Sequence, residues 1–99
     1  MQFLVMGYDG ADEGALARRM AAREKHLAGA EQLIKAGRIL YGAAMLNERG
    51  EMAGSMIVTD FPDREGLDAW LKTEPYVTGD VWRRVEIVPC KVPPMFQKP

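Results

Sequence analysis

The fold is decided by residues 13–46, which read EGALARRMAAREKHLAGAEQLIKAGRILYGAAML. Apolar side chains recur in the first part of this stretch at steps of three, four and seven residues, which is typical of a helix with one apolar stripe. The members of the stripe are Leu16, Met20, Leu27, Ala30 and Ile34. Gly37 follows as a typical residue for ending a helix, because glycine readily adopts a left-handed backbone. We therefore predict one long helix over residues 13–36, followed directly by a strand.

Strand-like segments lie before and after this helix. Residues 3–6 form a short apolar run that Gly7 would close, as in a strand buried on both faces. Asp12 is placed to cap the helix, and Glu13 is favourable in its first turn because the helix dipole attracts negative charge there. Residues 38–46 and 52–59 are two further strands. The polar loop between them contains Gly50, which predicts a hairpin.

A second helix and a last strand complete the predicted fold. Asp63 opens the helix as its cap, and Pro75 ends it. Its inward face is apolar at helical spacing and consists of Leu67, Trp70 and Leu71. Residues 81–88 then form the last strand. Its two sides carry Val81, Val85 and Ile87 on one and Trp82 and Val88 on the other.

The predicted order is β-α-β-β-α-β, which is the order of the ferredoxin-like fold. We therefore expect an α+β protein in which two helices cover one face of a four-stranded antiparallel sheet. A chain of 99 residues is too short for two hydrophobic cores, so we expect one domain over residues 1–92 and a C-terminal tail at residues 93–99. The strands carry apolar side chains on both sides, whereas the helices cover only one. A second copy is the simplest cover for the other face, and we predict a homodimer through it.

Composition and charge exclude several classes of function. The net charge of -1 argues against a protein built to neutralise nucleic acid. Cys90 is the only cysteine, which rules out an intrachain disulfide and a cysteine-rich zinc site and fits a reducing cytoplasm. The first ten residues have neither a basic leader nor an apolar run long enough to span a membrane. We expect a cytoplasmic protein that binds neither nucleic acid nor membrane.

Three nitrogen-rich side chains stack on one side of the long helix. Arg19, Arg23 and His26 are separated by four and three residues, so they lie on successive turns beside the apolar stripe. Two interpretations are open. In the first, the arginines extend past the core to pair with carboxylates such as Asp9 or Glu74, and His26 belongs to a structural hydrogen-bond network. In the second, the three form a pocket for an anionic substrate in which His26 is a general acid or base, since histidine titrates near neutrality.

We expect no metal and no cofactor. The chain has one histidine and scattered carboxylates, which lack the spacing of zinc ligands. It also has no glycine-rich phosphate loop and no dinucleotide-binding fingerprint. Besides a second copy of the chain, the expected partner is a small anionic molecule.

A family resemblance runs through the same residues. Residues 19–27, RMAAREKHL, resemble the R-x-x-x-R-x-x-H-L signature of the YciI-like (YCII-related) family. Further family motifs follow in the expected order across residues 2–92. They are Tyr8-Asp9, the GRIL of residues 37–40 leading to Gly42, Gly54-Ser55, Trp70, the EPYV of residues 74–77, Gly79 and Val85. Each motif is short, but their shared order and spacing are specific.

The resemblance implies a ferredoxin-like fold, a dimer of the dimeric α/β barrel type and a proposed active site built on a His–Asp pair. His26 matches the family histidine directly. The family aspartate belongs to a D-P-[YF] motif, and this chain has Glu74 at that position. The extra methylene moves the carboxylate by about 1.5 Å, the length of one C–C bond. Asp9 is the alternative carboxylate partner for His26.

Similarity of family members to muconolactone-pathway enzymes implies proton-transfer chemistry. The expected protein is a cofactor-independent isomerase or lyase, such as a dehydrochlorinase, that acts on a small acidic or lactone compound. Arg19 and Arg23 would hold a substrate carboxylate. Ser55 and Tyr76 are further candidates for ligand contacts, with structural roles as the alternative. Two other functions stay open: a non-catalytic small-molecule-binding or accessory module, and a structural partner of another protein.

Overall fold

The elements of the chain are arranged around one four-stranded sheet. The computed structural model describes residues 1–97, so the last two residues of the expected C-terminal tail lie outside the described range. The elements are β1 (Gln2–Asp9), α1 (Ala15–Lys35), β2 (Ile39–Leu46), β3 (Met52–Asp60), α2 (Arg64–Leu71), α3 (Pro75–Thr78), β4 (Trp82–Cys90) and the short 3-10 helix η1 (Pro94–Phe96). This order confirms the predicted α+β, ferredoxin-like fold.

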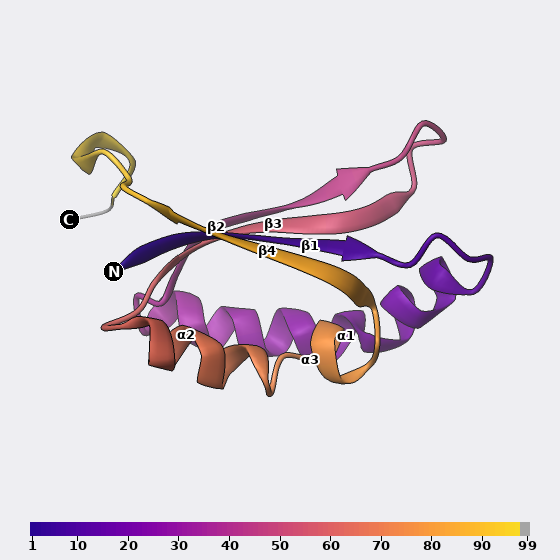
Figure 1. Cartoon of the computed structure of the whole chain (residues 1–99), viewed down its shortest axis with the longest axis horizontal. Helices are drawn as coiled ribbons and strands as arrows, with labels where there is room; N and C mark the ends of the chain where they lie inside the picture. Colours follow the sequence, from indigo (N-terminus) through magenta and orange to yellow (C-terminus); the bar gives the residue numbers. More distant parts are fainter. Residues whose placement is uncertain (98–99) are drawn as a thin grey trace.

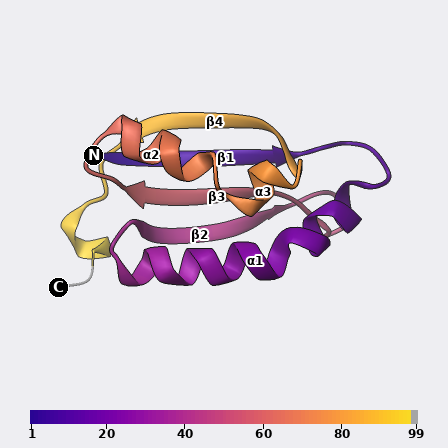
Figure 2. The ribbon, with the colours of Figure 1, turned by 90° about the horizontal axis from the view of Figure 1, so that it is seen from below.

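The sheet is antiparallel, with the strand order β2-β3-β1-β4. The helices α1, α2 and α3 lie against one of its faces (Figure 1, Figure 2). β1 is a central strand, in which Val5 lies opposite Ile57 of β3 and Ile87 of β4. Every second residue of β1 from Phe3 to Gly7 is buried, because the side chains of a strand alternate between its faces. The core therefore forms between the sheet and the helical layer; it consists of Phe3, Val5, Ile39, Ile57, Phe61, Leu67, Tyr76, Val81 and Trp82.

The ends of α1 are only partly as predicted. Gly14 is the N-cap, and the carboxylate of Asp12 instead accepts hydrogen bonds of 2.7 and 2.8 Å from Arg18. The prediction of Asp12 as the cap was wrong, as was that of Glu13 in the first turn, because the Asp12–Arg18 pair holds this segment outside the helix. At the other end the prediction is confirmed. Gly37 has a φ of +76°, the left-handed backbone expected after a helix.

The apolar stripe of α1 does not form the core. Met20, Leu27 and Ile34 are 50%, 46% and 56% exposed, whereas the buried side chains of α1 are Arg19 and His26. The helix runs alongside the edge strand β2 (Figure 2), whose central residues are glycine and alanine, so the stripe has no layer of large side chains to pack against. α1 is the longest helix, but no helix within residues 1–97 is both long and apolar enough to cross a membrane.

Pro75 begins a short helix of its own. The prediction that it ends the second helix was wrong. Asp63 caps α2 as predicted, accepting a hydrogen bond of 2.8 Å from the Gly66 N–H. That helix ends at Leu71, and Pro75 is the first residue of α3. Proline suits this position because its fixed φ is helical and its missing N–H would have no partner within the helix. The separate helix places Glu74 at an N-cap in the interior.

Gly7 lies inside β1, which continues to Asp9, so the prediction that Gly7 closes the strand was wrong. The indole ring of Trp82 lies over this glycine, and a Cβ at residue 7 would overlap with three of the ring atoms. Trp82 therefore lies on the helix side of the sheet. The prediction that it shares a side with Val88 was wrong. A register shift between Tyr8 and Asp9 in the β1–β4 pairing accounts for the difference, because such irregularities re-aim side chains.

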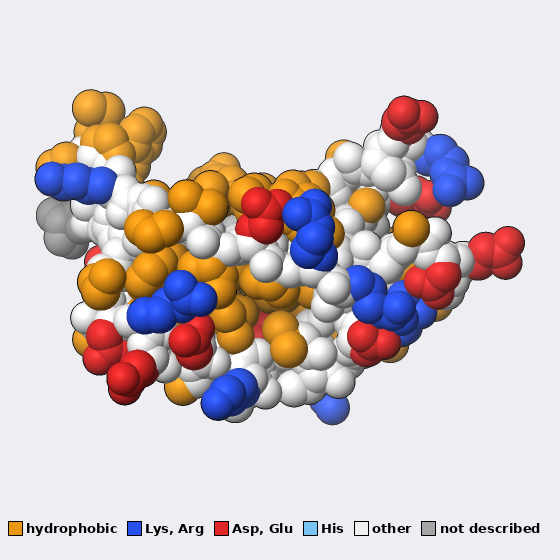
Figure 3. Space-filling view, in the orientation of Figure 1, with side chains coloured by type: hydrophobic (Ala, Val, Ile, Leu, Met, Phe, Trp, Pro, Cys, Tyr) orange, Lys and Arg blue, Asp and Glu red, His pale blue; other side chains and the backbone are white. Residues whose placement is uncertain are grey.

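The face of the sheet away from the helices is largely apolar. Its large hydrophobic side chains are Leu4, Met6, Tyr8, Tyr41, Met45, Met56, Val58 and Val88. The ion pair of Arg84 and Glu86 lies on the same face. Tyr41 is 66% exposed and Val88 is 42% exposed. Figure 3 shows hydrophobic side chains along the upper surface of the molecule, with acidic and basic groups near its centre, and further charged side chains at both ends of the molecule. We call the face of the sheet away from the helices the open sheet face. The predicted homodimer would cover it.

Candidate active site

The histidine on α1 contacts the carboxylate that caps α3. Nδ1 of His26 and Oε1 of Glu74 form a hydrogen bond, and the same oxygen accepts a hydrogen bond of 3.2 Å from the Tyr76 backbone N–H. Glu74 is 3% exposed and His26 9%. Because a carboxylate only accepts hydrogen bonds, the neutral imidazole carries its proton on Nδ1 and keeps a lone pair on Nε2. Within residues 1–97, no hydrogen bond engages that second nitrogen.

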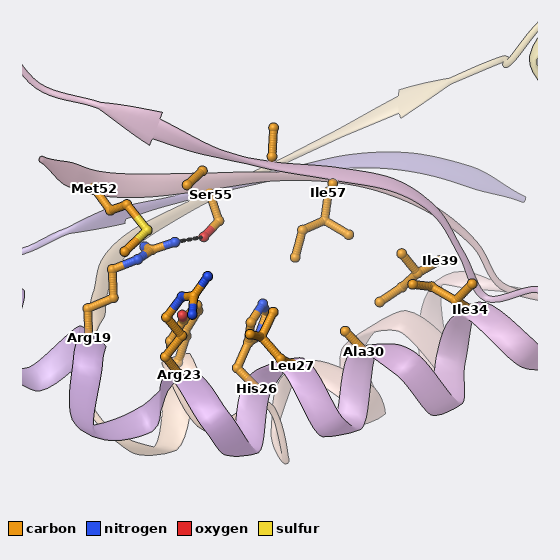
Figure 4. Close-up of a pocket in the computed structure, with 14 residues that line it drawn as sticks. Arg19, Arg23, His26, Leu27, Ala30, Ile34, Ile39, Met52, Ser55 and Ile57 are labelled. Carbon is orange, nitrogen blue, oxygen red and sulfur yellow. Dashed lines mark hydrogen bonds between the residues drawn. The ribbon is translucent and has the colours of Figure 1, made fainter. Parts of the chain in front are cut away.

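Aromatic side chains hold the imidazole ring in place. The ring of Tyr76 is stacked on His26, with centroids 4.0 Å apart and planes at 16°. Trp82 meets the imidazole edge-on at 6.3 Å and meets Tyr76 edge-on at 5.6 Å. Packing on two sides fixes the ring plane, so Nε2 has a defined direction. Figure 4 shows a ring nitrogen of His26 pointing into the space between α1 and the sheet.

Asp9 belongs to a different pair. One terminal nitrogen of Arg19 lies 3.0 and 3.2 Å from the two carboxylate oxygens of Asp9, and the other donates to Ser55 Oγ at 2.8 Å. The side chains of Arg19 and Asp9 are 3% and 1% exposed. Burial raises the pKa of the Asp9 carboxyl above its usual value, and the Arg19 guanidinium acts in the opposite direction. The structure thus joins His26 to Glu74, and Asp9 to Arg19.

The two arginines of the RMAAREKHL segment are not equivalent. Arg19 is held by Asp9 and Ser55, and its guanidinium also lies 4.6 Å from the centroid of the Tyr76 ring. Arg23 is half-buried. Among the residues described, it makes neither a hydrogen bond nor an ion pair. Arg23 is therefore the cation with donors available to a ligand.

A cavity of about 250 Å³ lies between α1 and the strands β2 and β3 (Figure 4). Its polar end consists of Arg19, Arg23, His26, Ser55 and Tyr76. Its remaining walls are Leu27, Ala30, Ile34, Ile39, Gly42, Ala43, Ala44, Met52 and Ile57. Five of the seven predicted site residues therefore line one cavity, and the other two, Glu74 and Asp9, each support one of those five.

Tyr76 adds a hydroxyl group to the polar end of the cavity. Burial raises the pKa of this hydroxyl above its usual value of 10, although the positive charges of Arg19 and Arg23 act in the opposite direction. The phenol is therefore protonated at neutral pH and can donate a hydrogen bond. No group of three or more His, Cys, Asp or Glu side chains within residues 1–97 is placed to share a metal ion.

Two features were not predicted: the apolar walls of the cavity, and the close contact between Gly7 and the Trp82 ring. The exposed apolar stripe on α1 was interpreted as a core face, which it would be over a strand with large side chains. The run of small residues at Gly42, Ala43 and Ala44 was the available signal that space is left beside the helix. Gly7 gave no comparable signal, because its close approach to Trp82 depends on a register shift between strands.

The chain is similar to known proteins over nearly its whole length. The model of the family described as YCII-related domain matches residues 1–91. Protein YciI of Escherichia coli and Protein YciI of Shigella flexneri are each 31% identical to the chain over 97 residues, which cover 92% of this chain and 97% of the relative.

Solved structures share the fold. One is 5-chloro-2-hydroxyhydroquinone dehydrochlorinase (TftG) from Burkholderia phenoliruptrix AC1100, in complex with 2,5-dihydroxybenzoquinone. Its TM-score is 0.79 at 23% identity, over 92% of this chain and 94% of that chain. A dimeric ferredoxin-like protein of unknown function from Jannaschia sp. CCS1 has a TM-score of 0.51 at 17% identity, over 92% of this chain and 98% of that chain. At these identities the likeness shows the fold alone.

Proposed function

The chain belongs to the YCII-related domain family, and we propose that it is a small cofactor-independent enzyme in which His26 moves a proton on a small acidic or lactone compound. The observation that carries the proposal is the hydrogen bond from the imidazole to the buried Glu74 carboxylate, with the other ring nitrogen left to a cavity. A carboxylate in this position orients the ring and stabilises the imidazolium that forms when Nε2 takes a proton. Glu74 thus fills the position at which the family resemblance implies an aspartate.

Proton transfer at Nε2 supports two related reactions. In an isomerisation, Nε2 removes a proton from one carbon and the imidazolium returns it to another carbon of the same substrate. In an elimination, Nε2 takes the proton and the electron pair of the broken C–H bond forms a double bond. A leaving group such as chloride departs with the electron pair of its bond to carbon. Negative charge develops on the substrate in both cases, and the guanidinium of Arg23 would offset it. TftG is named as a dehydrochlorinase, which makes elimination the first reaction to test.

The test is a panel of small lactones, acids and chlorinated hydroquinones, with product formation followed by NMR. His26→Gln is expected to abolish turnover, at least a hundredfold, while the melting temperature stays close to that of the wild type. Lys25→Gln is the matched control, since this neighbour on α1 is exposed and lies outside the cavity. A compound that binds unchanged, with His26 dispensable, would instead assign the chain to the non-catalytic binding modules.

We also infer that the chain forms a homodimer through the open sheet face. The support is the row of half-buried and exposed apolar side chains on that face, with Tyr41 and Val88 the most exposed of those on its strands. A second copy of the same face would remove these side chains from water. We also propose a cytoplasmic location, which the single cysteine of the chain fits.

A further inference from the structure

The cavity continues well beyond the groups that would move the proton. Leu27, Ala30 and Ile34 follow His26 along α1 as its lining residues. The eight steps along the helix from His26 to Ile34 span about 12 Å, at a rise of 1.5 Å per residue. Ile39 and Ile57 face this segment from the sheet (Figure 4). Beyond Arg19, Arg23 and His26, no charged side chain among the described residues lines the cavity.

Small residues of β2 leave this apolar arm open. Gly42 pairs with Ile57, so it belongs to the face of the sheet that looks toward α1 and lies over the arm. Ala44 is on the same face but pairs with Ser55, at the polar end. A Cβ at residue 42 would meet no atom closer than 3.6 Å, which is ordinary contact distance. The empty volume thus results from the choice of small side chains and not from a backbone constraint. A larger side chain on this strand would fill the arm.

Charge is confined to the opposite end. Arg23 lines the cavity beside His26 and is half-buried with no carboxylate partner within residues 1–97. A guanidinium in such surroundings is most strongly stabilised by an anion that can accept two of its hydrogen bonds. Arg19, in contrast, is already neutralised by Asp9. One anionic group can therefore be matched, and it must lie at the His26 end.

We propose that the site selects an amphipathic monoanion. Its acidic head group binds Arg23 next to His26, and its apolar body, aromatic or branched, lies along the arm between Ile34 and β2. Gly42 determines the size of that body. This inference rests on the proposed function only for the location of the ligand. It concerns binding, and so it can be tested without a chemical step.

The test uses three probes that separate charge from apolar surface: phenylbutanoate, phenylbutanol and butanoate. Binding to the untagged chain is followed by NMR titration at neutral pH. Phenylbutanoate is expected to bind at least about tenfold more tightly than either of the other probes. Arg23→Gln should reduce its affinity to that of phenylbutanol. Gly42→Leu should weaken both phenyl probes by about tenfold or more. Melting temperatures establish that each variant folds, and Gly42→Ala is the milder substitute if Gly42→Leu does not.

Matched controls are Arg49→Gln and Ala28→Leu, because both residues are exposed and neither lines the cavity. Both should bind phenylbutanoate as the wild type does. The inference is wrong if butanoate binds as tightly as phenylbutanoate, if none of the probes binds, or if binding is unchanged in both Arg23→Gln and Gly42→Leu. Turnover separates the two proposals, because His26→Gln should abolish it, whereas the probe titrations of the wild type, Arg23→Gln and Gly42→Leu involve no chemical step. If the probes bind as expected but no compound is turned over, this inference holds and the proposal of an enzyme is wrong.

Discussion

At the scale of residues, the site combines two buried pairs with different consequences. Glu74 accepts from the imidazole and from the Tyr76 N–H, so its charge is spread over two donors. Asp9 has only Arg19 as its hydrogen-bond partner within residues 1–97, and burial outweighs the attraction of that cation, which leaves the pKa of Asp9 raised. The first pair orients the ring that we propose moves the proton, and the second holds Arg19 at the polar end of the cavity.

Asp9→Asn tests the direction in which the pKa of Asp9 is shifted. A carboxyl whose pKa is higher in the folded than in the unfolded chain stabilises the fold fully below its unfolded pKa of about 4, and this contribution is lost as pH rises through the folded pKa. Asparagine resembles the protonated form and does not titrate. We expect the variant to lie within about 1 kcal/mol of the wild type at neutral pH, and the wild type to gain stability relative to it in acid. Urea unfolding of both chains across this range checks the prediction, which a relative gain of the wild type with rising pH would contradict.

Arg19→Gln leaves the Asp9 carboxylate buried without its cation. The free energy of unfolding is expected to fall by about 3 kcal/mol at neutral pH, because an unpaired buried charge is costly. The loss should shrink in acid as Asp9 takes up a proton. Arg64→Gln removes an exposed pair with Asp68 and should cost only about 0.5 kcal/mol at neutral pH. A loss for Arg19→Gln that does not vary with pH would show that Asp9 is not its cause.

At the scale of elements, the support beneath the site is a contact between two strands. Gly7 of β1 lies under the indole of Trp82, and that indole packs against His26 and Tyr76. Any side chain at residue 7 must displace the ring, and the displacement is passed to the imidazole. Gly7 therefore acts on the site without touching the cavity.

Gly7→Ala is expected to lower the free energy of unfolding by about 1–3 kcal/mol, the usual cost of overpacking a core. Turnover or probe binding should fall together with the near-ultraviolet circular dichroism signal of Trp82. Gly29→Ala is the control, since a Cβ there meets nothing within 4 Å and alanine favours the helix by up to about 1 kcal/mol. Full stability and an unchanged tryptophan signal in Gly7→Ala would contradict the described packing.

The order of elements could be predicted from the sequence because each has a local cause. The Asp63 cap, the Gly37 stop and the polar hairpin loop act within a few residues of themselves. The errors concern features that depend on distant neighbours. Pro75 begins α3 because Glu74 caps that helix in the interior. The stripe of α1 is exposed because the middle of β2 opposite it is built from small residues. The position of Trp82 depends on a register shift, which no local pattern encodes.

The candidate site could be predicted to a similar degree. Helical spacing brought Arg19, Arg23 and His26 together, and the family resemblance pointed to Glu74. The sequence left open whether Asp9 or Glu74 meets His26, because that choice depends on the direction in which α3 enters the core. It also gave no sign that Arg19 and Arg23 differ in their partners.

At the scale of the whole molecule, the proposed homodimer depends on the open sheet face. Its apolar side chains lie opposite to the helical layer, and a dimer through this face would leave the cavity mouth between α1 and β2 free. Light scattering coupled to size-exclusion chromatography should therefore give twice the chain mass of 11.0 kDa. Val58→Lys, in the middle of the face, should shift the chain to a monomer. Ala69→Lys adds the same charge on exposed α2 and should stay dimeric; a monomeric wild type would contradict the assembly.

The central claim is that Glu74 sets the direction of the imidazole so that Nε2 is free to take a proton. The chain has a single histidine, so the nitrogen-15 NMR spectrum of the untagged protein reports on His26 alone. We predict that the neutral ring carries its proton on Nδ1 and shows an unprotonated Nε2, and that Glu74→Ala removes this preference. A neutral ring protonated on Nε2 in the wild-type chain would contradict the account.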